Sequence, residues 1–520
     1  MKTELNRRQL LKLCAAGASV ALTSGLSSIS VAATRADNTL RLSVNITPGV
    51  LNPMLSRAAA EYMMSEMLYS GLTSLGTDMT AQPDLATEWS SNDDVTQWRF
   101  TLRQGVKFSN GQELTSKDVV ASLRKLLDPE TGAPGRRNLG PIKMVEADGD
   151  YTVVVTTETP FADLPVALTY PTAKVVPADI IATNFDSLAQ VPVGSGPFRL
   201  QEFRVDEVAV LVKNPEYFVA GLPYLNQIEI KTFPDAAGST AALLAGEIDM
   251  IHDVQPTDFA RIDQASGVSG LRTPSGRFLD VVMDTTVAPF DNILVRQALS
   301  YCVDREAMIE LVADGYGTPG NDTPINAAYH YYADAPHKSY DPKKAKTLLA
   351  EAGYPNGLDL ELIASVKPGY RSTMAVVLRE MAKAGGFNIS VKTMDHSSYL
   401  DQVWKKGKFY VGFYNMMPTE GMSFNLLFTS GASWNETKWN NTTFDEYVRL
   451  ADETTDSEKR KELYANAQSL MQKEVPALIP CFFDILGAKA DYVNGYEQHP
   501  RGASFAFHKI WVGSNPPTKS

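Results

Sequence analysis

Alternation of apolar and polar residues predicts β-strands along much of the chain. In residues 39–45, Leu40, Leu42 and Val44 are apolar, and the residues between them are polar. A two-residue period is typical of a strand with one buried face. We expect further strands over residues 98–103, 151–157, 208–213, 227–232, 278–283, 358–364, 387–393 and 409–414.

Apolar residues spaced three and four positions apart predict helices between these strands. The helix that follows Thr115 begins with a capping box, because Asp118 stands three residues after Thr115. Asp291 and Asp304 are the expected N-caps of two consecutive helices, and Pro342 is the expected first residue of another. The other helices are expected over residues 58–68, 239–245, 370–384, 397–405, 444–451 and 457–473.

Strands and helices alternate after residue 340, which predicts βαβ units and a sheet that is at least partly parallel. The chain is long enough for two to four folding units. No repeat, low-complexity tract or Pro/Ser-rich linker separates these units. We therefore expect interleaved lobes, with the chain crossing between them more than once.

The N-terminus has the pattern of an export signal. Arg7 and Arg8 precede a moderately apolar run over residues 13–29, and small residues follow at 30–33. A charged region, an apolar region and a small-residue end are typical of a secretory signal peptide. The adjacent arginines favour the twin-arginine route; the alternative is an ordinary signal with a chance arginine pair. We predict a signal peptide over residues 1–33 and a periplasmic protein.

The three cysteines give no indication of a metal or redox site. Cys14 is not a lipid attachment site, because Lys12 and Leu13 stand where small uncharged residues are needed. Cys302 and Cys481 lie in apolar surroundings, and we interpret both as small buried hydrophobic residues. A disulfide between them stays open as an alternative.

The charge of the chain argues against a nucleic-acid partner. Without residues 1–33 the chain has 44 basic and 59 acidic residues, so its net charge moves from −12 to −15. Binding to phosphates requires clustered cations. No later segment offers the roughly 20 consecutive apolar residues of a membrane span.

Several segments of the chain resemble one family of transport proteins. The most specific is Arg99-Phe-Thr-Leu-Arg-Gln-Gly-Val-Lys-Phe-Ser-Asn-Gly, which continues to Val119. The other segments are residues 82–89, 193–198, 213–218, 244–249, 340–346 and 349–354. Their order and spacing resemble the extracellular solute-binding proteins, family 5, of bacterial peptide importers. The resemblance covers nearly all of the chain after residue 33.

The resemblance implies an α/β fold of the periplasmic-binding-protein type, class II. Two α/β lobes would be joined by a hinge, and the first would carry an inserted subdomain. By analogy, the first lobe would comprise residues 38–80, 194–280 and 497–520. The inserted subdomain would comprise residues 81–193, and the second lobe residues 281–496.

The family's function would be capture of a peptide or peptide-like solute by lobe closure. The protein would deliver the solute to a membrane permease driven by ATPase subunits, and we expect a monomer without cofactor, metal or enzymatic activity. An alternative is the same function with a nickel chelate, opine, sugar or haem as cargo. A secreted hydrolase and a chaperone-like binder are further alternatives, but the chain has no His-Glu-x-x-His or Gly-x-Ser-x-Gly motif. Gly194-Ser195-Gly196 also lacks the Lys-Ser/Thr of a phosphate-binding loop.

Charged candidates for cargo binding follow from the resemblance. Lys367 lies near the family's carboxylate-binding arginine, and Arg371 follows it. Dipeptide binders have an aspartate shortly after a Gly-Trp pair, where this chain has Gly412 followed by Phe, Tyr, Asn and Met. Glu420 is therefore a candidate anion for a cargo ammonium group. The alternative for each charged residue is a solvated surface position.

Aromatic and amide side chains supply the remaining candidates. Trp434, Asn435 and Trp439 form one group, and Tyr414 and Asn415 form another. Aromatic walls with a few amide groups suit a pocket that tolerates varied cargo. Trp439 is equally consistent with the core, and Asn415 with a turn cap.

Overall fold

The structure of the protein is a computed structural model that describes residues 38–502 and 506–513. Contacts divide the chain into two units, Met1–Thr34 and Arg35–Ser520, and all elements named below belong to the second unit. The predicted signal peptide lies outside the described residues. No helix in the described part of the chain is both long enough and apolar enough to cross a membrane.

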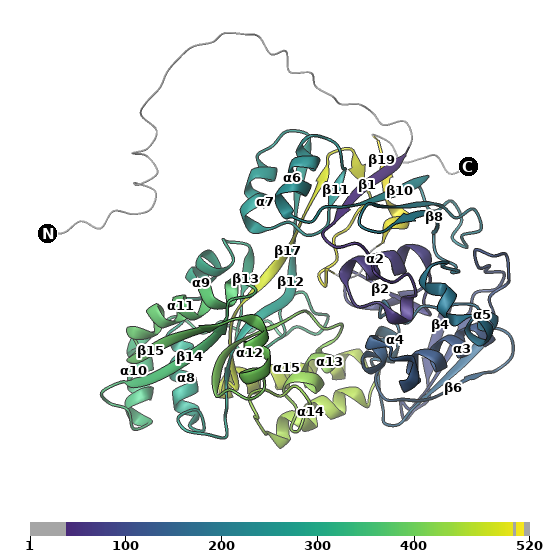
Figure 1. The fold of residues 1–520 in the computed structure, drawn as a ribbon. Helices are drawn as coiled ribbons and strands as arrows, with labels where there is room; N and C mark the ends of the chain where they lie inside the picture. Colours follow the sequence, from purple (N-terminus) through teal and green to yellow (C-terminus); the bar gives the residue numbers. More distant parts are fainter. Residues whose placement is uncertain (1–37, 503–505, 514–520) are drawn as a thin grey trace, which may run out of the picture. The chain divides into compact units, whose positions relative to one another are not determined.

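One large mixed sheet runs through the described structure (Figure 1). Its eleven strands include parallel pairs formed by β14 with β15 and β16, and by β1 with β10 and β11. The prediction of a partly parallel sheet is confirmed. The order along the sheet is β15 (Phe387–Met394), β14 (Leu358–Ser365), β16 (Phe409–Tyr414), β12 (Val268–Met283), β17 (Ala477–Ala490), β11 (Met250–Ile251), β1 (Thr39–Val44), β10 (Gln227–Thr232), β9 (Val208–Lys213) and β8 (Phe198–Arg204), with β13 (Gly317–Pro319) paired to β17.

Two long antiparallel strands, β12 and β17, belong to both halves of this sheet. Residues 268–273 of β12 pair with β17 in the half that contains β11, and residues 277–282 pair with β17 in the half that contains β16. Between them, residues 274–276 of β12 face only Asp484 of β17, which is a bulge. Bulges bend a strand and redirect its side chains, and they accept a proline that cannot donate to the ladder. We call residues 273–277 and 483–485 the hinge.

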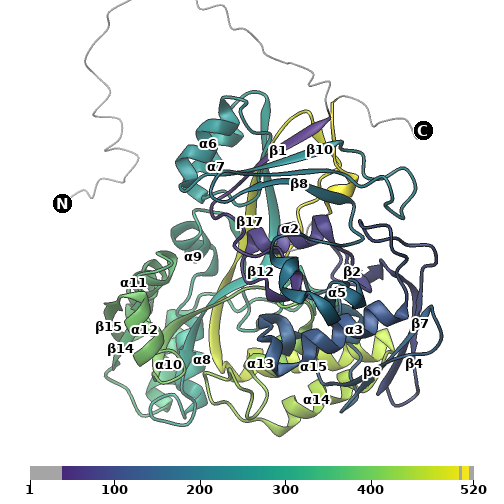
Figure 2. The same cartoon turned by 45° about the vertical axis from the view of Figure 1, so that its right-hand side comes forward.

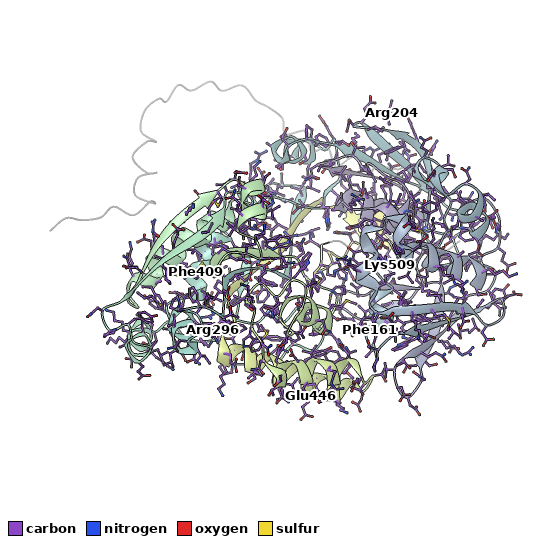
Figure 3. All side chains as sticks on the ribbon, turned by 60° about the horizontal axis from the view of Figure 1, so that its bottom comes forward. Phe161, Arg204, Arg296, Phe409, Glu446 and Lys509 are labelled. Atoms are coloured by element: carbon purple, nitrogen blue, oxygen red, sulfur yellow. The ribbon has the colours of Figure 1, made fainter. Side chains whose placement is uncertain are left out.

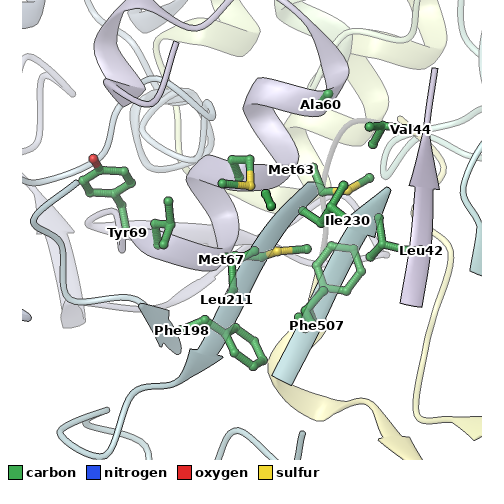
Figure 4. Close-up of a cluster of buried hydrophobic side chains, with 14 of the residues drawn as sticks. Leu42, Val44, Ala60, Met63, Met67, Tyr69, Phe198, Leu211, Ile230 and Phe507 are labelled. Atoms are coloured by element: carbon green, nitrogen blue, oxygen red, sulfur yellow. The ribbon is translucent and has the colours of Figure 1, made fainter. Parts of the chain in front are cut away.

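The first lobe packs α2 (Ala59–Leu68) on the sheet. Met63 and Met67 of this helix share one buried cluster with Leu42, Leu211 and Ile230 of the strands (Figure 4). A second cluster joins α6 (Ala236–Leu244) and α7 (Pro256–Asp263) to β11 and β17. The remaining short elements here are β2 (Thr73–Leu75), β3 (Ala81–Pro83), β18 (Val493–Asn494) and β19 (Trp511–Val512).

A four-stranded antiparallel sheet with its own core forms the inserted part. The order is β4 (Ala86–Ser91), β5 (Gln97–Leu102), β7 (Thr152–Thr157) and β6 (Ile142–Ala147). Helix α3 (Ser116–Leu127) buries Val119 and Leu123 against Phe100 and Val153. The predicted capping box is confirmed, because the Asp118 carboxylate accepts from the Thr115 backbone N–H at 2.8 Å. The short helices α4 (Leu164–Ala167) and α5 (Ala178–Thr183) follow.

The second lobe has two groups of helices (Figure 2). One group shares a core with strands β12, β14, β15 and β16, and Cys302 and Cys481 lie buried and free within it, as predicted. Its helices are α8 (Ile293–Tyr301), α9 (Arg305–Val312), α10 (Pro342–Glu351) and α11 (Tyr370–Lys383). Helix α12 (His396–Gln402) buries Tyr399 in a small separate cluster with Val282 and Tyr410. The other group, with its own cluster, is α13 (Glu420–Leu427), α14 (Thr442–Asp452) and α15 (Ser457–Glu474).

The inserted part contacts the helices of the second lobe directly. Asp163 forms a buried ion pair with Arg460 of α15 and accepts a hydrogen bond from the Thr419 hydroxyl. The backbone N–H of Ala162 donates to the carbonyl of Asp452 at 3.0 Å. Phe161, labelled in Figure 3, marks the start of this junction. Two segments almost 300 residues apart are thereby held together.

Two local predictions need correction. Asn292, rather than Asp291, caps α8, because its side-chain oxygen accepts from the Leu294 N–H at 3.0 Å. The strand predicted over residues 278–283 is the second half of β12, which begins ten residues earlier at Val268. Pro274 and Gly276 conceal that first half, because both residues are unfavourable in a regular central strand.

Gly196 lets strand β8 begin against the end of α2. A Cβ atom at this position would lie 2.4 Å from the carbonyl carbon of Leu68 and 2.5 Å from the backbone nitrogen of Tyr69. Backbone atoms cannot rotate away, so Gly196→Ala is expected to destabilise the protein by about 2 kcal/mol in urea unfolding. Gly369→Ala is the control, because a Cβ there meets nothing within 4 Å. Equal effects of the two substitutions would contradict this account.

Candidate functional site

Arg277 is the last residue of the hinge on strand β12. It follows the bulge in β12, and its Nη2 lies 3.7 Å from the position of a Cβ atom at Gly502. The Gly502 carbonyl is 2.7 Å from the Nε2 atom of His252, which follows β11. Burial raises the pKa of Tyr370, at the start of α11, and the charges of Arg277 and Arg371 oppose that shift. Arg277 therefore faces segments of both lobes.

Arg501 lies beside the same C-terminal segment. Its Nε donates to the Met416 carbonyl at 3.3 Å, while its Nη1 is buried without a hydrogen-bond partner. Burial lowers the pKa of Arg501, and the hydroxyls of Tyr170 and Tyr329 act against that shift. A guanidinium group removed from water without a counter-ion is electrostatically unfavourable.

His499 fixes the backbone of Arg501. Its Nδ1 accepts from the Arg501 backbone N–H at 3.1 Å, and its Nε2 donates to the Gly76 carbonyl at 3.0 Å. Burial, followed by the charge of Arg501, lowers the pKa of His499 to about 4. The ring is therefore neutral at pH 7, with its proton on Nε2. This neutral form holds Arg501 in place without adding positive charge.

A cavity of about 580 Å³ adjoins these residues in the first lobe. Its lining includes His499, Glu66 and Arg103, and also Lys509, which Figure 3 labels. The walls come from α2, from β2 and β3 with their connection, and from the C-terminal segment. The volume is within the range of small-molecule sites.

The second lobe contributes a buried group of three charges, Asp280, Arg371 and Glu436, which we call the charge cluster. Burial raises the pKa of Asp280 well above its ordinary range, and the nearby Glu436 raises it further. Burial also raises the pKa of Glu436, whereas hydrogen bonds from Tyr414 and other donors lower it. Burial thus opposes ionisation of both acids, and the charge of Arg371 favours it.

Arg371 is held mainly by aromatic rings. Its guanidinium lies over the rings of Tyr399 and Phe413, at 5.2 and 5.8 Å from their centroids. The side chain is buried, and its Nε and Nη1 have no hydrogen-bond partner. Such stacking positions a guanidinium without using its donors.

Three of the predicted site residues come together around this cluster. The Tyr414 hydroxyl donates to Glu436, which also accepts from the Trp404 indole. Trp434 is 36% exposed and packs edge-on against Trp404, with ring centroids 5.5 Å apart. Its centroid is 6.1 Å from that of Tyr414. Tyr414 and Trp434 thus form an aromatic wall, which is exposed at Trp434. Arg371 belongs to the charge cluster next to this wall.

The other predicted residues lie apart from this wall. Lys367 is exposed in the loop after β14, and Asn415 is exposed after β16. Glu420 is buried at the first position of α13, where it accepts from the Tyr331 backbone N–H.

The Asn435 amide donates to the carbonyls of Phe428, Thr429 and Trp439. Trp439 lies in the core, and its indole donates to Glu474 at 2.8 Å.

Sequence reasoning did not identify Arg277, Arg501, Asp280 or Glu436. Only Arg277 follows a recognisable signal, since Pro-Ser-Gly interrupts the strand just before it. The other three have no neighbouring motif. In residues 38–502 and 506–513 no three His, Cys, Asp or Glu side chains gather as a metal site.

Comparison with known proteins identifies the family. Residues 80–437 match the family of bacterial extracellular solute-binding proteins, family 5 Middle. The chain belongs to this family. The predicted family and fold class are confirmed, and with them the function of a solute-binding component of an ABC importer.

Similar proteins cover nearly the whole chain. Heme-binding protein A of Haemophilus influenzae is 29% identical over an alignment of 482 positions, and the match covers 86% of this chain and 87% of that protein. Glutathione-binding protein GsiB of Salmonella typhimurium is 27% identical over 465 residues, with 87% and 89% covered. The structure of HbpA2 from Haemophilus parasuis superposes with a TM-score of 0.83 at 25% identity, covering 92% of this chain and all of that one.

Proposed function

We propose that the protein captures a small peptide or peptide-like solute between its lobes and delivers it to a permease. The observation that carries this proposal is the hinge, where β12 and β17 alone join the two halves of the sheet in the described structure. A solute that contacts both lobes is bound more tightly when they close, so binding shifts the hinge equilibrium. The hinge, Arg277, Arg501 and the aromatic wall lie where such a solute would be enclosed.

The names of two similar proteins narrow the range of candidate cargoes. One is a glutathione-binding protein and the other a heme-binding protein. Glutathione is a tripeptide, which supports the peptide-like cargo. Haem is the second candidate, because its planar ring suits the aromatic wall of Tyr414 and Trp434.

Mass spectrometry of the solute released from the purified protein tests this proposal. The stripped protein is then titrated with the identified solute while scattering reports its dimensions and molar mass. We expect binding at one solute per chain, a decrease in radius of gyration, the mass of a monomer and unaltered solute. A chemically altered solute, or binding without a change in dimensions, would contradict capture by lobe closure.

We also propose export through the twin-arginine route. Arg7 and Arg8 support this proposal, and both lie outside the described residues. Replacing both with lysine is expected to leave most of the protein as precursor in the cytoplasm, as measured by cell fractionation. Lys2→Arg is the control. Export of the double variant at the normal level would instead indicate an ordinary signal peptide.

A further inference from the structure

We infer that the cargo carries two acidic groups, one bound by Arg277 and the other by Arg501. This inference rests on the proposed function, because it specifies the solute that the hinge encloses. Arg277 of the hinge and Arg501 of the C-terminal segment would then determine which solutes bind.

The guanidinium groups of Arg277 and Arg501 lack acceptors for some of their N–H donors. In the described part of the chain, the guanidinium of Arg277 forms no hydrogen bond or ion pair, and Nη1 of Arg501 is buried without an acceptor. Arg277 is half-buried, so its guanidinium can still be hydrated. Nη1 of Arg501 is buried, and because buried polar groups in folded proteins almost always have partners, this exception requires an explanation. An anion that enters with the cargo would supply these partners.

Two other buried arginines, Arg296 and Arg305, have their acceptors in place. Arg296 donates to the carbonyls of Phe290, Glu474 and Val475. Arg305 pairs with Asp322 at 3.0 Å and donates to the Gly320 carbonyl at 2.8 Å. Arg371 and Arg460 also have buried guanidinium nitrogens without an acceptor. Arg460 is nevertheless paired with Asp163 and Arg371 lies over two aromatic rings, whereas Arg501 forms no ion pair within the described residues.

No acid near the hinge neutralises Arg277 and Arg501. Glu66, the nearest acid to influence Arg501, is already paired with Lys174 at 2.8 Å. Asp253 lies near His252 and Tyr370, but it is exposed and forms no ion pair with Arg277. Asp280 and Glu436 interact with the charge of Arg371. Asp484, in the hinge itself, is paired with Arg272. Within the described residues, Arg277 and Arg501 therefore have no ion-pair partner.

Closure of the lobes would make this excess charge unfavourable unless an anion arrives. Removing water from a cation costs several kcal/mol unless an opposite charge and hydrogen bonds replace it. A carboxylate accepts two parallel N–H donors from a guanidinium, which gives direction as well as charge. Arg277 comes from the shared strand β12, and Arg501 bonds to Met416 of the second lobe. A dicarboxylate would thus couple charge neutralisation to closure.

Calorimetry with paired ligands tests the inference. Glutathione and haem each carry two carboxylates, and their diesters keep the same scaffold without these charges. We expect at least one of the two acids to bind and its diester to bind about 100-fold more weakly. Arg277→Gln and Arg501→Gln should each weaken binding of the acid by about 10- to 100-fold. Arg261→Gln, an exposed arginine on α7, should bind normally.

Thermal unfolding of the solute-free variants separates a binding role from a structural one. Because Arg277 has no partner and Arg501 has only the Met416 carbonyl, the Gln variants should unfold within a few degrees of the unmodified protein. Equal binding of acid and diester, or unchanged binding by both variants, would overturn the inference and leave the receptor function intact.

If neither acid binds, the number of acidic groups on the solute released from the purified protein tests the inference instead. Two or more acidic groups on it would support the inference, and fewer would overturn it. Failure to detect any released or bound solute would count against the proposed function itself.

Discussion

Arg460→Ala is expected to destabilise the protein by about 3–5 kcal/mol, because it leaves Asp163 buried without its counter-ion. Asp163 is 2% exposed, and its other oxygen accepts only from the Thr419 hydroxyl. Arg460 also lies over the rings of Tyr331 and Tyr464, so the substitution removes packing as well as charge. Equilibrium unfolding in urea measures the loss.

Arg449→Ala on α14 is the matched control. Arg449 pairs with Glu446 and Glu453, but its side chain is 52% exposed, so its loss should lower the stability far less than the loss of Arg460. The double variant Asp163→Asn with Arg460→Met should recover much of the stability, because the uncompensated charge is gone. An Arg460→Ala effect no larger than that of Arg449→Ala would show that this junction contributes little.

The ion pair between Asp163 and Arg460 also joins the inserted part to the second lobe. Asp163 belongs to the inserted part, whereas Arg460 and Thr419 belong to helical segments of the second lobe. The two parts of the molecule are therefore connected away from the hinge strands. Movement about the hinge must either preserve this buried contact or expose it, and the cost of exposing a buried pair favours preserving it.

Local signals in the sequence were sufficient for most of the individual elements. Strands β9, β10 and β16 have the predicted bounds, because β9 and β10 alternate between apolar and polar residues and β16 is a short apolar run. Helix α10 begins at Pro342 and is followed by Gly353 with φ of +98°, as its capping pattern indicated. These features depend on residues that are neighbours in the chain.

The candidate site could be predicted only in part, because it depends on contacts between distant residues. The charge cluster joins Asp280, Arg371 and Glu436 from a strand, a helix and a loop, and no spacing rule connects them. Arg277 and Arg501 meet only because the C-terminal segment returns to the hinge. The family resemblance identified the region of Arg371 and Tyr414, but it could not show which cations lack partners.

Glu420→Gln is expected to stabilise the protein by about 3 kcal/mol at pH 8 and to have little effect at pH 4.5. Burial raises the pKa of Glu420 from its ordinary 4.5 to about 7. The folded state therefore binds more protons than the unfolded state between these values. The contribution of Glu420 to stability is fully present below pH 4.5 and is lost as the pH rises to about 7. Glutamine cannot ionise, and its oxygen can still accept from the Tyr331 N–H.

Urea unfolding of both proteins at pH 5, 6, 7 and 8 measures this difference, and titrations of other groups cancel between them. Glu462→Gln, an exposed position on α15, should show the same small effect at every pH. A stability difference for Glu420→Gln that stays constant from pH 5 to pH 8 would show that Glu420 is ionised throughout this range. In that case an anionic Glu420 could serve a cargo ammonium group, whereas a protonated one at neutral pH supports only the buried contact with Tyr331.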